Sequence, residues 1–205
     1  MFGVVVAALL VVQAPAQETR PAIDPELREL ALRALVEDAD IPKLVALYDG
    51  EKNTEHRELI LRELGDRDSA EARKKLADVA SRETDKELQE TAVRLLAEQG
   101  DTTAVIAMYD AQKDPELKEV ILRELGDRSD AAAQQKLVSI MRGDGDPELR
   151  EAAARAIADE APTKMLIELF DSIPNMDVRE ILVRELGERD DDLARQKLLS
   201  IIQGK

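Results

Sequence analysis

The chain has 205 residues, 44% of them hydrophobic, and this length and apolar content exclude a wholly disordered polymer. Its 29 basic and 44 acidic side chains give a net charge of −15, which argues against a nucleic-acid ligand because phosphate binding relies on lysine and arginine. Cysteine is absent, which excludes disulfides and thiolate chemistry, while the low aromatic content of 2% favours close-packed helices.

The N-terminal segment is apolar and uncharged. Residues 4–12 are all apolar, and the small residues Ala14 and Ala16 follow where a signal peptidase reads. We therefore expect a signal peptide at residues 1–16, cleaved after Ala16, then a linker at residues 17–23. The segment is shorter than the roughly 20 residues that cross a bilayer, so we expect export to the periplasm or medium and no transmembrane segment in the mature chain. Because no basic residue precedes the apolar run, a start upstream of Met1 stays open.

The remaining sequence repeats with a period of 61 residues. Residues 60–67 recur as 121–128 and, with small changes, as 182–189. This period predicts three units, at 24–84, 85–145 and 146–205. Apolar residues within each unit follow helical spacing, which predicts four helices arranged as two hairpins.

Start and stop signals delimit these helices. Three starts share the order Asp-Pro-Glu, which places a capping carboxylate before a first-turn proline: Asp24, Asp114 and Asp146. Three stops share a glycine after a leucine, which we expect to adopt a positive φ: Gly65, Gly126 and Gly187. Six hairpins and about twelve helices follow, and they must stack because no hairpin buries its apolar face alone.

Residues 146–157, with the sequence DPELREAAARAI, resemble the first helix of a bacterial HEAT repeat, including the HEAT-like repeats of phycobilisome lyases. The resemblance covers residues 24–205. It implies an all-α, right-handed α-solenoid of about six stacked hairpins. It also implies a concave face, lined by the second helix of each pair, that binds a protein or peptide. Members of the family serve as scaffolds, adaptors and, occasionally, enzymes.

Catalytic and metal-binding constellations are missing from the sequence. His56 is the only histidine, and Leu117 and Val178 stand at its equivalent positions, so we interpret it as a surface residue. No Gly-x-Ser-x-Gly turn occurs, and residues 143–146 fit a hairpin turn better than an EF-hand. We therefore expect no enzyme activity, no catalytic, cofactor-binding or metal residue, and no cofactor.

Two sets of side chains recur at the 61-residue interval. The first is an aromatic set that we interpret as core: Tyr48, Tyr109 and Phe170. The second is basic and could bind an anionic partner on the concave face: Lys75, Lys136 and Lys197, with Arg73 and Arg195 beside them. In the alternative interpretation, which we favour, the lysines pair with acids of the preceding turn: Asp66, Asp127 and Glu188.

The C-terminal helix repeats positions that serve stacking in the preceding unit. Its apolar residues match Leu137, Val138, Ile140 and Met141, and they are Leu198, Leu199, Ile201 and Ile202. We interpret them as an end-to-end contact, either in a homo-oligomer or with a capping partner.

Together these observations predict an exported scaffold or adaptor that binds a protein or peptide. Two alternatives stay open. One is a HEAT-like lyase or enzyme subunit, which would need a pocket of polar residues outside the repeat. The other is a purely structural spacer.

Overall fold

The computed structural model describes residues 24–67, 69–143 and 145–204, and the expected signal peptide and linker lie outside them. The described residues form twelve α-helices and no strand, which confirms the all-α class. Within the same ranges, no helix has the length and apolar character needed to cross a bilayer. The helices are α1 (Pro25–Glu37), α2 (Ile41–Gly50), α3 (Thr54–Asp66), α4 (Ala70–Arg82), α5 (Lys86–Gln99), α6 (Thr102–Ala111), α7 (Pro115–Gly126), α8 (Ala131–Arg142), α9 (Pro147–Glu160), α10 (Thr163–Ser172), α11 (Met176–Glu188) and α12 (Asp192–Ile202).

Side-chain caps begin the helices. The carboxylates of Asp24, Asp114 and Asp146 accept hydrogen bonds from backbone N–H groups two residues on, at 2.9, 3.0 and 2.9 Å, which confirms the predicted starts. Among the described helices, only α10 begins without a side-chain cap, because Pro162 precedes it. Each cap satisfies a donor that the first turn would otherwise leave unpaired.

The predicted role of the three glycines is wrong. Gly65, Gly126 and Gly187 all lie within helices, and in the described residues only Gly204 has a positive φ. At Gly126 the missing side chain permits a close helix approach instead, since a Cβ there would lie 2.4 Å from the Ala156 carbonyl oxygen. Helices α7 and α9 can therefore pack almost backbone to backbone.

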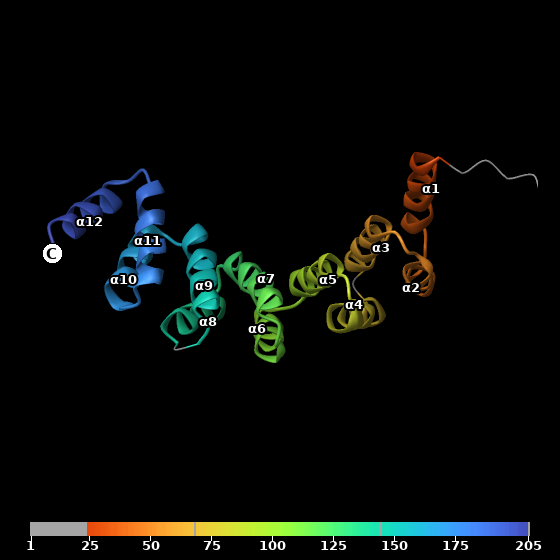
Figure 1. The fold of residues 1–205 in the computed structure, drawn as a ribbon, viewed down its shortest axis with the longest axis horizontal. Helices are drawn as coiled ribbons and strands as arrows, with labels where there is room; N and C mark the ends of the chain where they lie inside the picture. The colour runs from red at the N-terminus through yellow and green to blue at the C-terminus, as the bar shows by residue number, and fades with distance from the viewer. Residues whose placement is uncertain (1–23, 68, 144, 205) are drawn as a thin grey trace, which may run out of the picture.

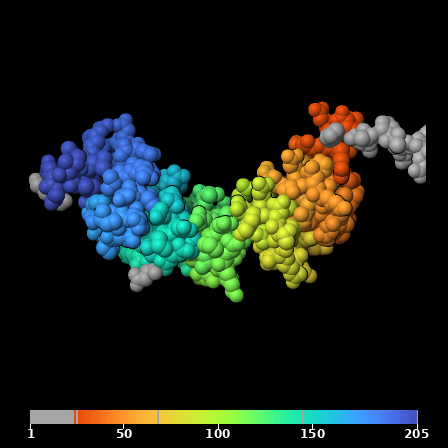
Figure 2. Space-filling model, viewed as in Figure 1, coloured from red at the N-terminus to blue at the C-terminus, as the bar shows by residue number. Residues whose placement is uncertain are grey.

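The helices follow one another along an elongated arc (Figure 1). The odd-numbered helices form its inner row, and the even-numbered helices from α2 to α10 form its outer row. Each odd helix from α3 onward packs extensively on the next odd helix, whereas contacts between successive even helices are sparser. This inequality curves the chain and leaves the hollow side visible in Figure 2.

The core runs along the arc as two hydrophobic clusters that both include α5. Leu88 and Ala92 of α5 belong to the N-terminal cluster, and Val93 and Ala97 belong to the C-terminal one. The repeated rings are buried, which confirms their interpretation as core: Tyr48, Tyr109 and Phe170 are 2%, 7% and 7% exposed.

His56 is buried rather than on the surface, so that interpretation is wrong. It is 9% exposed, and its Nδ1 lies 3.2 Å from a carboxylate oxygen of Glu51. The equivalent residues Leu117 and Val178 are also buried. The histidine thus occupies a core position and takes its polar partner from the preceding loop.

Candidate functional site

The lysine set is committed to contacts within the chain. Lys75, Lys136 and Lys197 each form an ion pair with an aspartate 26 residues earlier, and Nζ lies 2.6 Å from the carboxylate in the first two pairs. These partners are Asp49, Asp110 and Asp171, so the predicted pairing with Asp66, Asp127 and Glu188 is wrong. The lysines therefore pair with acids of this chain, as the structural interpretation predicts, but the acids are not the ones that it names.

Each of these lysines also lies over a repeated ring. The ring centroids of Tyr48, Tyr109 and Phe170 are 4.7, 5.1 and 5.0 Å from the respective lysine Nζ. A second cation contacts each ring, and these cations are Arg57, Lys118 and Arg179. The attraction of a cation to an aromatic face helps to hold such groups in place. The lysine side chains are only 12%, 20% and 13% exposed, so little of their charge reaches solvent.

The hollow side is lined by the first helix of each pair (Figure 1), so the expected lining by second helices is wrong, and the structure does not gather the five predicted basic residues there. Helices α4 and α8, which carry Lys75, Arg73 and Lys136, lie on the outer side of the arc (Figure 1). Arg195 pairs with Asp190 and with Asp192 of its own helix. A partner-binding role for these residues stays a prediction.

The carboxylate of Glu83 joins the first of the repeated rings, Tyr48 of α2, to Arg57 of α3. Its carboxylate accepts hydrogen bonds from Tyr48 Oη and the Thr84 backbone, both at 2.9 Å, and from Arg57. Burial alone would raise the pKa of Glu83, but these hydrogen bonds outweigh burial and lower the pKa from 4.5 to about 2.

We expect this carboxylate to make the fold sensitive to acid. Because its pKa is lower in the folded state, Glu83 stabilises the fold fully above about pH 4.5, and the contribution is lost as pH falls toward about 2. It amounts to about 3 kcal/mol at neutral pH. Glu83→Gln should reduce stability at pH 7 and flatten its decline between pH 5 and pH 3, as measured by urea unfolding. Glu71→Gln, at an exposed acid of α4, should leave the profile unchanged, and parallel profiles for all three proteins would contradict the assignment.

A second pattern occupies the inner helices. Every odd-numbered helix carries an acid, an arginine and an acid at positions i, i+4 and i+8, the last of them at the C-cap in α7, and this spacing places all three on one helix face. The first acid row is Glu29, Glu58, Glu90, Glu119, Glu151 and Glu180. The arginine row is Arg33, Arg62, Arg94, Arg123, Arg155 and Arg184. The second acid row is Glu37, Asp66, Glu98, Asp127, Asp159 and Glu188.

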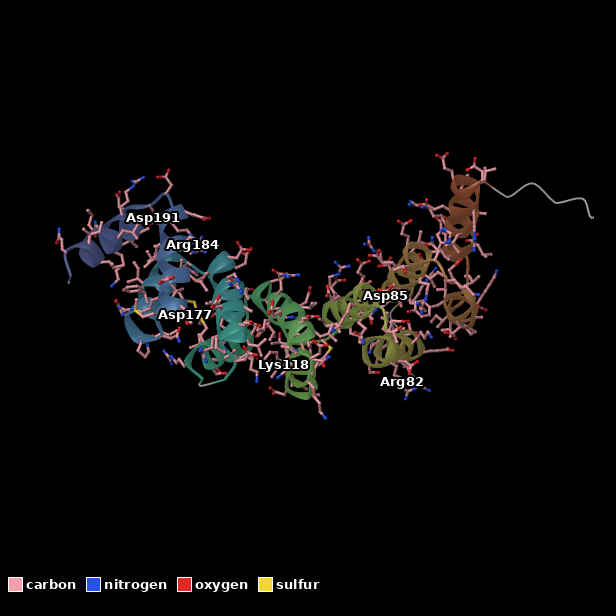
Figure 3. The ribbon with its side chains drawn as sticks, viewed as in Figure 1. Arg82, Asp85, Lys118, Asp177, Arg184 and Asp191 are labelled. Atoms are coloured by element: carbon pink, nitrogen blue, oxygen red, sulfur yellow. The ribbon has the colours of Figure 1, made fainter. Side chains whose placement is uncertain are left out.

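The three rows meet in a groove of about 460 Å³ on α7, α9 and α11. Its apolar lining comes from Ala152, Ala156 and Ala158 of α9 and from Ile181 of α11. Row members also line it: Glu119, Arg123, Asp127, Arg155, Asp159, Arg184 and Glu188. Arg184 extends from α11 (Figure 3). The small residues of α9 leave the groove open between the charged side chains.

Ion pairs neutralise only part of this surface. In the first acid row, Glu29, Glu58 and Glu151 pair with the arginine one turn later, at 2.6, 2.7 and 3.3 Å. In the second acid row only Glu98 has an ion-pair partner among the described residues, Arg94 at 3.9 Å. No described residue forms an ion pair with Arg123 or Arg184. The twelve acids and six arginines of the rows leave a net charge of −6.

The second acid row also lies at the negative ends of its helices. No basic residue stands in the last turn of α1, α3, α5, α9 or α11. Helix dipoles favour cations at such ends. Three of these ends receive a cation from elsewhere in the chain, since Arg67, Arg128 and Arg189 donate to the carbonyl oxygens of Glu37, Ala97 and Ala158. The pKa of Glu124, which adjoins Arg123 on α7, is raised first by burial and then by Glu98 and Asp127. At this edge of the inner face, arginines thus partly compensate the helix ends, and the negative charge comes from the side chains of the second acid row.

The C-terminal apolar residues divide into two pairs. Leu198 and Ile201 pack partly against the core, whereas Leu199 and Ile202 are 57% and 82% exposed. Self-association through them stays a prediction, which light scattering at high protein concentration would test.

The described residues hold no group of three or more His, Cys, Asp or Glu side chains arranged to bind a metal ion. Neither a protein-family model nor a curated protein sequence matches the chain.

Proposed function

We propose that this chain is an exported scaffold or adaptor that holds a protein or peptide segment on the inner face of a HEAT-like, right-handed α-solenoid. The proposed solenoid has six hairpins in three 61-residue units. The observation that carries the proposal is the groove on α7, α9 and α11, where charged side chains, most of them without an ion-pair partner among the described residues, surround an apolar strip. Binding would be stoichiometric, without turnover.

The rows favour binding over a spacer role. A surface that only needed solubility could neutralise its charges in i,i+4 pairs, as Arg33 and Glu29 do. Around the groove, by contrast, Arg123 and Arg184 have no ion-pair partner among the described residues. The packed helices fix the backbone positions of these side chains, which suits recognition of a partner.

The rows also favour a scaffold over a lyase. A catalytic pocket on a repeat protein would be expected to recruit polar residues that differ between units. The groove instead uses Arg123 and Arg184, which recur at the 61-residue interval and have their equivalent at Arg62 on α3. Because these residues recur in each unit, the same surface continues along the other inner helices.

Photocrosslinking in cells tests the proposal. A photoreactive residue at Arg155, in the groove, should give a discrete adduct with one partner, while the same residue at Gln135, exposed on the outer helix α8, should not. Mass spectrometry of the adduct should also find Gln17 as the N-terminal residue, as export with cleavage after Ala16 requires. Equal labelling from both positions would contradict an inner binding face, and an adduct that retained residues 1–16 would contradict export.

A further inference from the structure

The spacing of the inner rows selects a particular kind of ligand. Successive odd helices from α3 to α11 pack directly on each other, and packed helices lie roughly 8–10 Å apart. Equivalent charges in a row therefore recur about every 9 Å along the hollow side of the arc. A partner that contacts the whole row needs charges with the same repeat.

A polyproline-II segment has this repeat. It rises about 3.1 Å per residue with three residues per turn, so every third side chain returns to the same face after about 9 Å. A β-strand returns to the same face after two residues, or about 6.6 Å, and falls out of step with the helices.

The groove charges that lack an ion-pair partner determine whether the ligand is cationic or anionic. Asp127, Asp159 and Glu188 line the groove, and no described residue forms an ion pair with any of them. Arg123 and Arg184 stand one helical turn away, on the side of the first acid row. They repel a cation that strays from the second acid row and so fix the path of a basic segment.

We propose that the inner face binds an extended, basic peptide segment in the polyproline-II conformation, with lysine or arginine at every third residue. Its cations pair with Asp127, Asp159 and Glu188, and its backbone crosses the apolar strip of α9. The inference rests on the proposed function and specifies the chemistry of the partner.

Two synthetic peptides separate this recognition from general attraction to an acidic protein. One repeats Lys-Pro-Pro, and its isomer has the same composition with all lysines together at one end. In fluorescence anisotropy on the full chain, the repeating peptide should bind several-fold more tightly. Its affinity should fall with added salt because exposed ion pairs are screened. Equal affinity for the two isomers, or binding of neither, would overturn the proposal.

Matched variants locate the contact. Asp127→Asn with Asp159→Asn should weaken binding of the repeating peptide about tenfold, the order expected from two lost ion pairs. Glu71→Gln with Glu168→Gln changes the net charge equally on the outer helices α4 and α10 and should alter affinity less than about twofold. Circular dichroism and thermal unfolding check that all four substitutions preserve the fold. An equal loss in both double variants would reduce the effect to net charge and overturn the proposal.

The two proposals fail in different ways. If neither peptide binds but Arg155 still crosslinks to a partner in cells, the basic-segment proposal is wrong and the scaffold function stands. If the repeating peptide binds in vitro while no adduct forms in cells, the recognition chemistry stands and the scaffold function loses its support.

Discussion

Replacing Gly126 by alanine should destabilise the protein by about 3 kcal/mol, the upper part of the range for overpacked interiors. The new Cβ would lie 2.4 Å from the carbonyl oxygen and 2.9 Å from the carbonyl carbon of Ala156. These are backbone atoms of α9, so no side-chain rotation relieves the clash and the two helices must separate. Urea unfolding would measure the loss as a lower midpoint.

The equivalent glycines of the other units supply matched controls. A Cβ at Gly187 meets nothing within 4 Å, so alanine there should be neutral or should stabilise α11 by up to about 1 kcal/mol. At Gly65 the three nearest atoms belong to the Leu95 side chain, the closest at 2.6 Å, and this side chain can move, so an intermediate effect is expected. Equal midpoints for the alanine variants at positions 126 and 187 would contradict the close approach of α7 and α9.

Replacing Arg128 by alanine should cost about 2–3 kcal/mol, because charge-assisted hydrogen bonds to buried acceptors are among the stronger ones. Arg128 Nη2 donates to the carbonyl oxygens of Ala97 and Gly100, at 2.7 and 2.9 Å. Its Nη1 donates to Thr102 Oγ1 at 3.3 Å. The arginine thus joins the loop after α7 to the C-terminal end of α5, and its removal leaves those carbonyls without this donor.

Hydrogen exchange and urea unfolding would measure the loss, with faster exchange expected near Gly100. Arg94→Ala is the control, because Arg94 has only a 3.9 Å ion pair with Glu98 and should change stability by less than about 0.5 kcal/mol. Comparable losses in the two variants would contradict a bridging role for Arg128.

Features encoded by neighbouring residues were predictable from the sequence. The caps at Asp24, Asp114 and Asp146 depend on residues within one turn, and their contacts are as expected. The burial of Tyr48 and Tyr109 also followed from helical spacing and recurrence. Local chemistry and periodicity sufficed in each case.

Features that depend on the distance between helices were not predictable in the same way. The helical conformation of Gly126 serves the approach of α9, which lies outside its own segment. The partner of Lys75 is Asp49 on α2, and no local rule distinguishes it from Asp66. The odd-numbered helices form the hollow side because they pack more extensively on each other than the even-numbered helices do.

The inner rows have a signal in the sequence. An acid stands four residues to each side of Arg62, Arg123 and Arg184. The same triplet recurs in all six odd helices, at alternating intervals of 29 and 32 residues. Recognising it as a surface required knowing that these helices share the hollow side of the arc.

The substantial contacts of this chain join helices no more than two apart in sequence. Tension applied to the two ends can therefore be distributed over successive contacts between helices. Each contact opens by a small angle while its buried side chains remain packed. The molecule should stretch elastically under tension before any helix detaches. A stiff ligand bound along the hollow side would fix the curvature of the protein.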